Sequence, residues 1–272
     1  PTDVEFATGA TTSWVYDVKS ANNGHSISMQ IKDYTDESTL YNMNATEGTR
    51  FFQFSDNGST ATEIYHIDQS LSATAGQKDG IGTQANFSIS GHDRDKNIIS
   101  GEIYDKTTHQ TTGNRGSFFN IAAGEDVKLD IKNLTIQDAQ KTGNGSVVEN
   151  NSEKAVITLN NVRVQNNEAT GNGGAIYNVV MPEDTTKANL IVTNSILNNN
   201  TAGGNGGAIY NAGNMAVTGT TFTDNAAAQG GAIYNAGNMT LTNVIVSAAN
   251  GSAANDIYHQ QHKAVQYTMQ AI

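Results

Sequence analysis

The chain contains no cysteine among its 272 residues, which excludes disulfide bonds, thiolate metal sites and thiol catalysis together. Proline occurs only at Pro1 and Pro182, so nearly every backbone amide is able to donate to a strand ladder. No apolar run approaches the roughly 18 residues that a membrane-spanning helix requires. We therefore expect no membrane insertion by this chain.

Charged residues are also scarce, because Asp, Glu, Lys and Arg make up only 15% of the chain. The balance is acidic: 26 acidic against 15 basic side chains give a net charge of -11. Nucleic acids and anionic membranes require clustered Lys and Arg, so neither is an expected partner. The surface must be covered mainly by Asn, Thr, Ser, Gln and Gly, which is typical of secreted β-solenoids.

A six-residue phrase recurs in the last third of the chain, and its isoleucines lie 33, 24 and 24 residues apart. Self-similarity at a period of this length indicates a solenoid. The longer step is explained mainly by an insertion after the first copy, and insertions in repeats form loops on one face. The intact copies are Gly173-Gly174-Ala175-Ile176-Tyr177-Asn178, Gly206-Gly207-Ala208-Ile209-Tyr210-Asn211 and Gly230-Gly231-Ala232-Ile233-Tyr234-Asn235, and a decayed copy ends in Ile257-Tyr258.

Segments that alternate apolar and polar residues run between these copies. Repeats rich in Gly, Asn, Thr and β-branched residues have poor helix propensity and good strand propensity. A period near 24 suits a coil of two or three short strands, with successive coils about 4.8 Å apart. We therefore predict an all-β, parallel β-helix in which one strand each covers residues 129–136, 157–164, 190–197, 216–222 and 239–246.

Stacking of such coils assigns structural roles to the repeated phrase. The isoleucines are expected to form an internal column, and the tyrosines and asparagines to form an aromatic and an amide ladder. The glycine pairs are expected at tight corners with positive φ; no helix or Lys follows them, as a phosphate-binding loop would need. A second core column is expected near Val162, Ile196, Phe222 and Ile245.

The N-terminal region is the least repetitive part, and residues 13–18 and 26–31 alternate as half-buried strands do. We expect residues 1–60 to form a β cap over the open end of the solenoid, since an exposed end needs cover. The alternative is a small β module that carries binding. The β-helix is expected over 61–260, and residues 261–272 are expected to be an incomplete last coil or the truncation of a longer passenger.

The Gly-Gly-Ala-Ile tetrapeptides within the three copies, together with Phe222-Thr223-Asp224-Asn225 as a Phe-x-x-Asn motif, resemble the polymorphic outer membrane protein family of autotransporters. Residues 196–199 are taken as a degenerate copy of the second motif, and the resemblance covers roughly residues 115–260. It implies a right-handed, pectin-lyase-like β-helix that serves as an adhesin-like passenger. It further implies export by a C-terminal β-barrel and exposure at a Gram-negative outer membrane or as a secreted protein.

The leading expectation is a non-enzymatic surface passenger, either an adhesin or a stalk that presents one, without catalytic residues, metal or cofactor. Its partner would be a host or neighbouring-cell surface protein or glycan. Binding is expected in the N-terminal region or in the insertion, because loops on a rigid scaffold carry recognition. The candidate binding residues of the insertion are Met181, Pro182, Glu183, Asp184 and Lys187.

Two alternatives remain open. Polysaccharide lyases and hydrolases also use the parallel β-helix, and a hydrolase needs paired carboxylates across a groove. The densest charged cluster is Asp93-Arg94-Asp95-Lys96, whose own cations neutralise its carboxylates, so a solvated turn is expected there. The other alternative is self-association through the Asn/Thr-rich faces of two solenoids.

Overall fold

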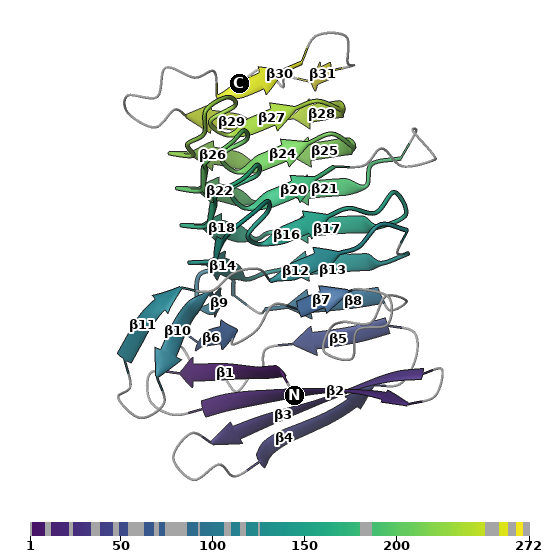
Figure 1. The fold of residues 1–272 in the computed structure, drawn as a ribbon, viewed down its shortest axis with the longest axis vertical. Helices are drawn as coiled ribbons and strands as arrows, with labels where there is room; N and C mark the ends of the chain where they lie inside the picture. The colour runs from purple at the N-terminus through teal and green to yellow at the C-terminus, as the bar shows by residue number, and fades with distance from the viewer. Residues whose placement is uncertain are drawn as a thin grey trace.

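The chain folds into an elongated stack of short strands, with the N-terminus at one end and the C-terminus at the other, as the computed structural model shows (Figure 1). No helix occurs in the described residues, and accordingly none of them forms an apolar helix long enough to cross a membrane. Parallel strands of successive coils lie above one another, which confirms the predicted parallel β-helix. The structure describes the backbone of residues 2–8, 12–21, 24–33, 39–45, 49–53, 63–67, 71–73, 86–91, 93–105, 110–114, 118–124, 126–179, 187–247, 256–260 and 265–268, and side chains within 89–91, 93–102, 118–124, 126–179, 187–247 and 256–260.

Three sheets, here named A, B and C, form the sides of the solenoid. The solenoid strands of sheet A are β6 (Glu63–Ile67), β9 (Asn97–Ser100), β14 (Thr135–Gln137), β18 (Arg163–Gln165), β22 (Ile196–Asn198), β26 (Thr221–Thr223) and β29 (Ile245–Ser247). Sheet B contains β5 (Thr49–Gln53), β8 (Asn86–Ser90), β13 (Lys128–Lys132), β17 (Val156–Asn160), β21 (Leu190–Thr193), β25 (Asn214–Thr218), β28 (Asn238–Thr242) and β31 (Val265–Thr268). Sheet C contains β7 (Leu71–Ala73), β12 (Phe119–Ile121), β16 (Val148–Asn150), β20 (Ile176–Asn178), β24 (Ile209–Asn211), β27 (Ile233–Asn235) and β30 (Ile257–His259).

Two smaller sheets complete the strand inventory of the described backbone. A three-stranded parallel sheet lies along the chain between sheets A and C, and it contains β15 (Gln140–Lys141), β19 (Glu168–Ala169) and β23 (Thr201–Ala202). An antiparallel hairpin is formed by β10 (Glu102–Asp105) and β11 (Gln110–Asn114).

The N-terminal strands continue sheet A in an antiparallel arrangement. Strand β1 pairs with β6, the first solenoid strand of the sheet, and β2 to β4 follow in order. The division at residue 60 between a cap and the solenoid stays a prediction. The bounds of these strands are β1 (Thr2–Thr8), β2 (Thr12–Ala21), β3 (Gly24–Asp33) and β4 (Thr39–Ala45).

Each expected strand of seven or eight residues is in fact two strands that meet at a corner, so the prediction of one strand per segment was wrong. Residues 129–136, for example, contribute to β13 on sheet B and to β14 on sheet A. The chain bends because a residue with a left-handed backbone conformation separates the two strands, and Asn and Gly adopt this conformation at little cost. The corner residues are Asn133 (φ 56°), Asn161 (φ 54°), Asn194 (φ 49°), Gly219 (φ 58°) and Asn243 (φ 52°).

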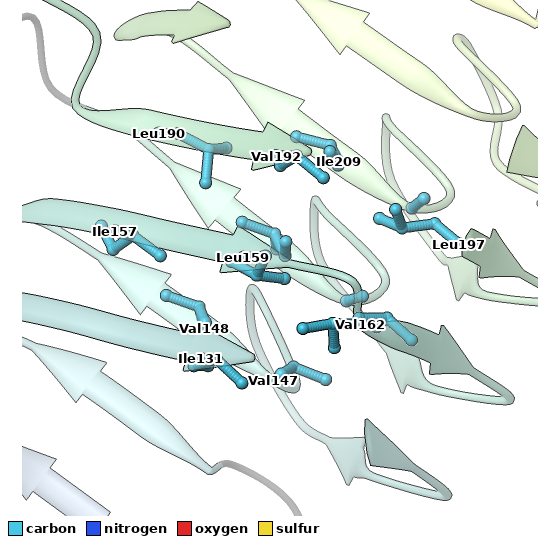
Figure 2. Packing of buried hydrophobic residues seen from close by; sticks show 14 of the residues in the cluster. Ile131, Val147, Val148, Ile157, Leu159, Val162, Leu190, Val192, Leu197 and Ile209 are labelled. Atoms are coloured by element: carbon cyan, nitrogen blue, oxygen red, sulfur yellow. The ribbon is translucent and has the colours of Figure 1, made fainter. Parts of the chain in front are cut away.

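The hydrophobic core fills the inside of the coils, where each sheet contributes its inward-facing side chains (Figure 2). Ile157 and Leu159 point inward from sheet B, and Ile176 from sheet C, all with no exposed surface. Equivalent residues stack from coil to coil, because the parallel register pairs Ile176 with Ile209 and Leu159 with Val192. The core is therefore a set of continuous apolar columns along the solenoid axis.

Of the four residues expected in the second core column, Val162 and Phe222 are fully buried, whereas the core position lies one residue after Ile196 and Ile245. On sheet A, Val164, Leu197 and Phe222 pair in register and are fully buried, whereas Ile196 is half-buried on the outward side. Ile245 is 61% exposed. Because side chains alternate faces along a strand, counting through the unnoticed corner displaced the assignment of Ile196 and Ile245 by one residue and placed them on the wrong face.

Candidate functional surface

The repeated tyrosines form an aromatic ladder on the outer side of sheet C. Ring centroids are 5.1 Å apart from Tyr177 to Tyr210, 5.1 Å from Tyr210 to Tyr234 and 4.9 Å from Tyr234 to Tyr258. The rings of the last two pairs are nearly parallel, with interplanar angles of 6° and 8°. Each inner ring therefore has both faces covered by its neighbours, and the ladder presents ring edges and hydroxyl groups outward.

The tyrosine ladder also changes the acidity of its hydroxyl groups. Burial, followed by the electrostatic influence of Tyr210 and of Glu149, raises the pKa of Tyr177 above 10.0. Burial and then Tyr234 raise the pKa of Tyr210 in the same direction. Glu149 occupies the tyrosine position one coil earlier and forms an ion pair with Lys141. Tyr177 and Tyr210 therefore favour the neutral hydroxyl, and a paired carboxylate lies beside Tyr177 on the preceding coil.

The repeated asparagines form a second, buried ladder next to the tyrosines. The amide of Asn178 donates to the side-chain oxygen of Asn211 at 2.8 Å, and Asn211 donates to Asn235 at 2.7 Å. The ladder begins at Asn150, which donates to Asn178 at 2.9 Å, and ends at His259, whose Nδ1 lies 3.2 Å from the amide nitrogen of Asn235. These side-chain amides form hydrogen bonds with one another inside the fold, so they are not available to a ligand.

The first glycine of each phrase sits at a corner that admits no side chain. Gly206 has φ 72°, and a Cβ atom there would overlap the carbonyl oxygen of Ile209. The second glycine has no positive φ, but it is equally confined in the first two phrases, where a Cβ on Gly207, for example, would overlap the carbonyl oxygen of Gly231 in the next coil. The glycine pairs are thus required by the close stacking of backbones.

The Phe-x-x-Asn motif joins a core residue to a buried corner amide. Phe222 has no exposed surface, and Asn225 donates to the carbonyl oxygen of Leu197 at 2.8 Å. Since Leu197 pairs with Phe222, the equivalent of the motif is residues 197–200 and not 196–199 as expected, and it too ends in a buried asparagine, Asn200. The amide of Asn200 donates to the oxygen of Asn225 at 2.9 Å, which forms a further ladder.

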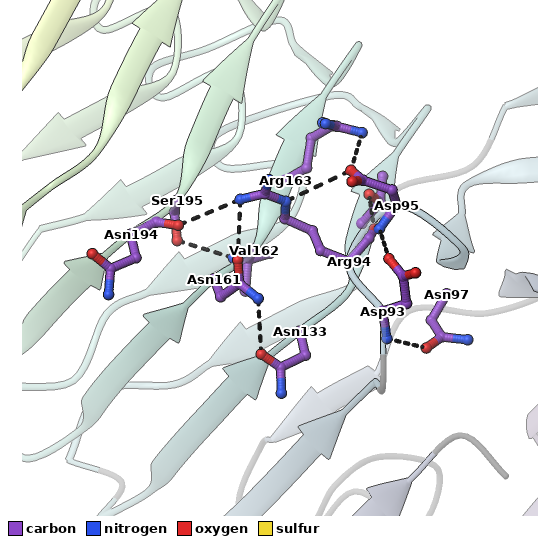
Figure 3. A network of polar contacts seen from close by, with 11 residues as sticks. Asp93, Arg94, Asp95, Asn97, Asn133, Asn161, Val162, Arg163, Asn194 and Ser195 are labelled. Atoms are coloured by element: carbon purple, nitrogen blue, oxygen red, sulfur yellow. Dashed lines mark hydrogen bonds and ion pairs between the residues drawn. The ribbon is translucent and has the colours of Figure 1, made fainter. Parts of the chain in front are cut away.

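The charged cluster at residues 93–96 forms a turn that lies against the corner between sheets B and A (Figure 3). Asp95 pairs with Arg163 at 2.7 Å, and Arg94 donates to the side-chain oxygen of Asn161 at 3.1 Å. Asp93 accepts the backbone N–H of Asp95 at 2.9 Å. The turn is therefore bonded to later coils of the solenoid through side-chain contacts. The sequence predicts only a solvated turn.

Both carboxylates of this turn thus have basic or backbone partners, with Lys96 also 3.5 Å from Asp93. Within the described side chains, no group of three or more His, Asp or Glu is arranged to hold a metal ion. Neither observation measures activity, so the enzymatic alternative stays a prediction.

One further carboxyl group near this turn in the sequence is perturbed, because burial and then the charge of Asp138 raise the pKa of Glu102.

The predicted binding insertion lies largely outside the described residues, which include none of Met181, Pro182, Glu183 or Asp184. Its two ends are described. Asn178 and Asn189 exchange side-chain hydrogen bonds of 3.0 and 3.3 Å, and Asn214 donates to the carbonyl oxygen of Lys187 at 3.1 Å. The segment from 179 to 188 therefore starts and finishes at a closed, buried amide pair.

Sequence reasoning missed several of the asparagine columns, although the same signal reveals them. Corner asparagines recur at the coil period, as the repeated phrase does, but their neighbours vary and hide the repeat. Side-chain hydrogen bonds along these columns join Asn161 to Asn133, Asn199 to Asn166, Asn167 to Asn200, and Asn238 to Asn214.

Comparison with known families matches residues 161–179, 194–212 and 219–236 to the Chlamydia polymorphic membrane protein repeat. Each matched segment begins at the corner residue between sheets B and A, and ends one residue after the buried asparagine of sheet C. The predicted resemblance to polymorphic outer membrane proteins is thereby confirmed over these coils, and it indicates an outer-membrane or cell-surface protein. No curated protein and no solved structure matches the chain.

Proposed function

We propose that this chain is a non-enzymatic passenger segment, exposed at the cell surface, that holds an adhesive insertion on a rigid stalk. The partner is a surface protein or glycan of a host or neighbouring cell. The observation that supports this most directly is the closed base of the insertion, where Asn178 and Asn189 exchange hydrogen bonds. A segment of variable sequence on a fixed base is how rigid scaffolds present recognition loops.

The stalk function is supported by how the repeat uses its polar groups. The asparagines of the phrase are fully buried and bond to one another along the axis. The tyrosine rings cover each other, and the glycines allow the backbones to stack. The residues of the repeated phrase therefore stabilise the stack of coils. A binding surface is accordingly expected in another part of the chain.

The next coil, which lacks the insertion, shows how to design a variant that tests this proposal. There, Ala212-Gly213 connects Asn211 directly to Asn214, where the earlier coil has residues 179–188 between Asn178 and Asn189. Replacing residues 179–188 by Ala-Gly should therefore shorten the 33-residue spacing from Ile176 to Ile209 to 25 residues, close to that of the next coil, with the stack intact. The intact chain and this variant would be displayed on beads and compared for binding to host cells and to glycan arrays.

We expect the intact chain to bind, and the shortened variant to lose binding while keeping its circular dichroism spectrum. Equal binding by both would place adhesion outside the insertion, and no binding by either would favour a stalk alone. Cleavage of a polysaccharide by the intact chain, abolished by Asp95→Asn, would instead support the enzymatic alternative.

A further inference from the structure

Charge is distributed unevenly along this chain. Of its 26 acidic and 15 basic residues, 24 and 14 respectively precede residue 188. Between residues 188 and 247 the only charged side chain is Asp224. Globular chains average about 25% charged residues, so these coils present hydroxyl, amide, aromatic and methyl groups almost exclusively.

One face of these coils forms a continuous uncharged stripe on the outside of sheet C. The half-buried tyrosines of the ladder form one row. A row of small half-buried residues runs beside it: Val179, Ala212 and Ala236 each directly follow a ladder asparagine. The backbone amides of this row donate to the preceding coil, for example from Ala212 to Asn178 at 2.7 Å and from Ala236 to Asn211 at 2.7 Å. We call Tyr177, Tyr210, Tyr234 and Tyr258 with Val179, Ala212 and Ala236 the tyrosine stripe.

We propose that the tyrosine stripe is a contact face for a second copy of this chain, side by side with the first. The stripe is a row of ridges with the strand spacing of a β-sheet, about 4.8 Å. A second solenoid with the same spacing between coils can contact the stripe at every coil. A partner without that spacing can contact only one or two of the ridges. Interdigitation of like side chains between paired sheets is the geometry of dry β interfaces.

The charge distribution supports a copy of the chain as the occupant. Each copy carries a net charge of -11, so two copies repel each other wherever their charged parts approach. Contact through the stripe itself buries no charged side chain, because its seven residues are all uncharged. A charged ligand would find no counter-charge there. A sugar would find no open face on the inner rings, because each inner ring is covered on both faces.

The size of the stripe sets the strength of the association. Four ladder positions span about 15 Å at the strand spacing of a sheet. The buried area is therefore a few hundred Å², well below the roughly 800 Å² per partner of a stable complex. The association is consequently weak in dilute solution and becomes effective where many copies are held together, as on a surface.

Sedimentation velocity of the purified chain over a range of concentrations tests this inference. We expect the sedimentation coefficient of the intact chain to rise with concentration, and to rise further in about 0.5 M NaCl, where repulsion is screened. Ala212→Glu should abolish the rise. Thr218→Glu adds the same charge at an exposed position of sheet B and should leave the rise unchanged.

Cysteine cross-linking provides a second measurement that does not depend on added charge. Because the chain has no cysteine, Ala236→Cys creates a unique thiol in the stripe, and Thr218→Cys creates one on sheet B. A short bis-maleimide should trap dimers of the first variant in preference to the second. A chain that sediments as a monomer at every concentration and salt, or equal trapping of both thiols, would overturn the proposal. Neither result depends on adhesion, so failure of the proposed function is distinguishable.

Discussion

Replacing Asn211 by leucine tests whether the buried asparagine ladder holds neighbouring coils together. Asn211 has no exposed surface, and its oxygen accepts a hydrogen bond from Asn178 at 2.8 Å. Its amide donates to the oxygen of Asn235 at 2.7 Å, and to the carbonyl oxygens of Gly213 and Asn238, each at 3.1 Å. Leucine is similar in size but forms no hydrogen bond, so four contacts are lost inside the fold.

The magnitude follows from the groups that lose a partner. The amide of Asn178 keeps its hydrogen bond to Asn189, so its loss is partial. The oxygen of Asn235 and the carbonyl oxygen of Asn238 each lose a donor, at about 1–3 kcal/mol for each group left unsatisfied. The carbonyl oxygen of Gly213 keeps the backbone N–H of Asn238 at 2.9 Å. Burial of the leucine side chain returns about 1.5–3 kcal/mol. We therefore expect a net loss of about 1–3 kcal/mol in the free energy of unfolding.

Urea unfolding followed by far-ultraviolet circular dichroism measures this loss. Asn160→Leu is the matched control, because it makes the same chemical change at an exposed position on sheet B, where a shift within about 0.5 kcal/mol is expected. Stability in solenoids is a sum of repeat and interface terms, so Asn211→Leu should also broaden or divide the transition. If both variants unfold at the same urea concentration, the ladder does not stabilise the stack.

Three further outcomes are expected. Because burial raises the pKa values of Tyr177 and Tyr210, the stability that comes from their neutral form is complete below about pH 10. It is lost as pH rises through the folded-state values, so absorbance at 295 nm should show tyrosine ionisation that coincides with alkaline unfolding. Gly124→Ala, at φ 81° with open space around it, should cost about 1–2 kcal/mol in thermal unfolding, and Gly206→Ala distinctly more, because its Cβ also overlaps backbone. Arg163→Met removes the pair with partly exposed Asp95 and should cost no more than about 1 kcal/mol in urea unfolding; a larger loss would mean that the turn clamps the coils.

The fold class could be predicted because one phrase repeats almost unchanged. Ile176, Ile209 and Ile233 recur with identical neighbours, and a parallel in-register stack is the arrangement that places them above one another. The same register brings the tyrosines face to face and the asparagines within hydrogen-bond distance. Periodicity alone therefore determines which residues meet, provided that one strand of the coil is identified correctly.

The corners could not be located from hydrophobic alternation. Residues 157–164 alternate as one strand would, but Asn161 adopts φ 54° and sends the second half onto another sheet. A left-handed residue leaves no mark on an apolar/polar pattern, because asparagine is also common on the outer face of strands. The useful signal was the recurrence of Asn or Gly at this position in every coil. The charged turn was equally hidden, since its partners Asn161 and Arg163 lie more than 60 residues away in sequence.

The insertion interrupts the solenoid without disturbing the register of its strands. Asn178 and Asn189 bond to each other below it, and the next coil pairs with both sides of the interruption, through Asn211 and Met215. The register is thus fixed whatever the length of chain between them. Closing a loop costs only about 0.6 kcal/mol more for each doubling of its length. Sequence and length can consequently change at this point while the columns of isoleucine, tyrosine and asparagine stay in place.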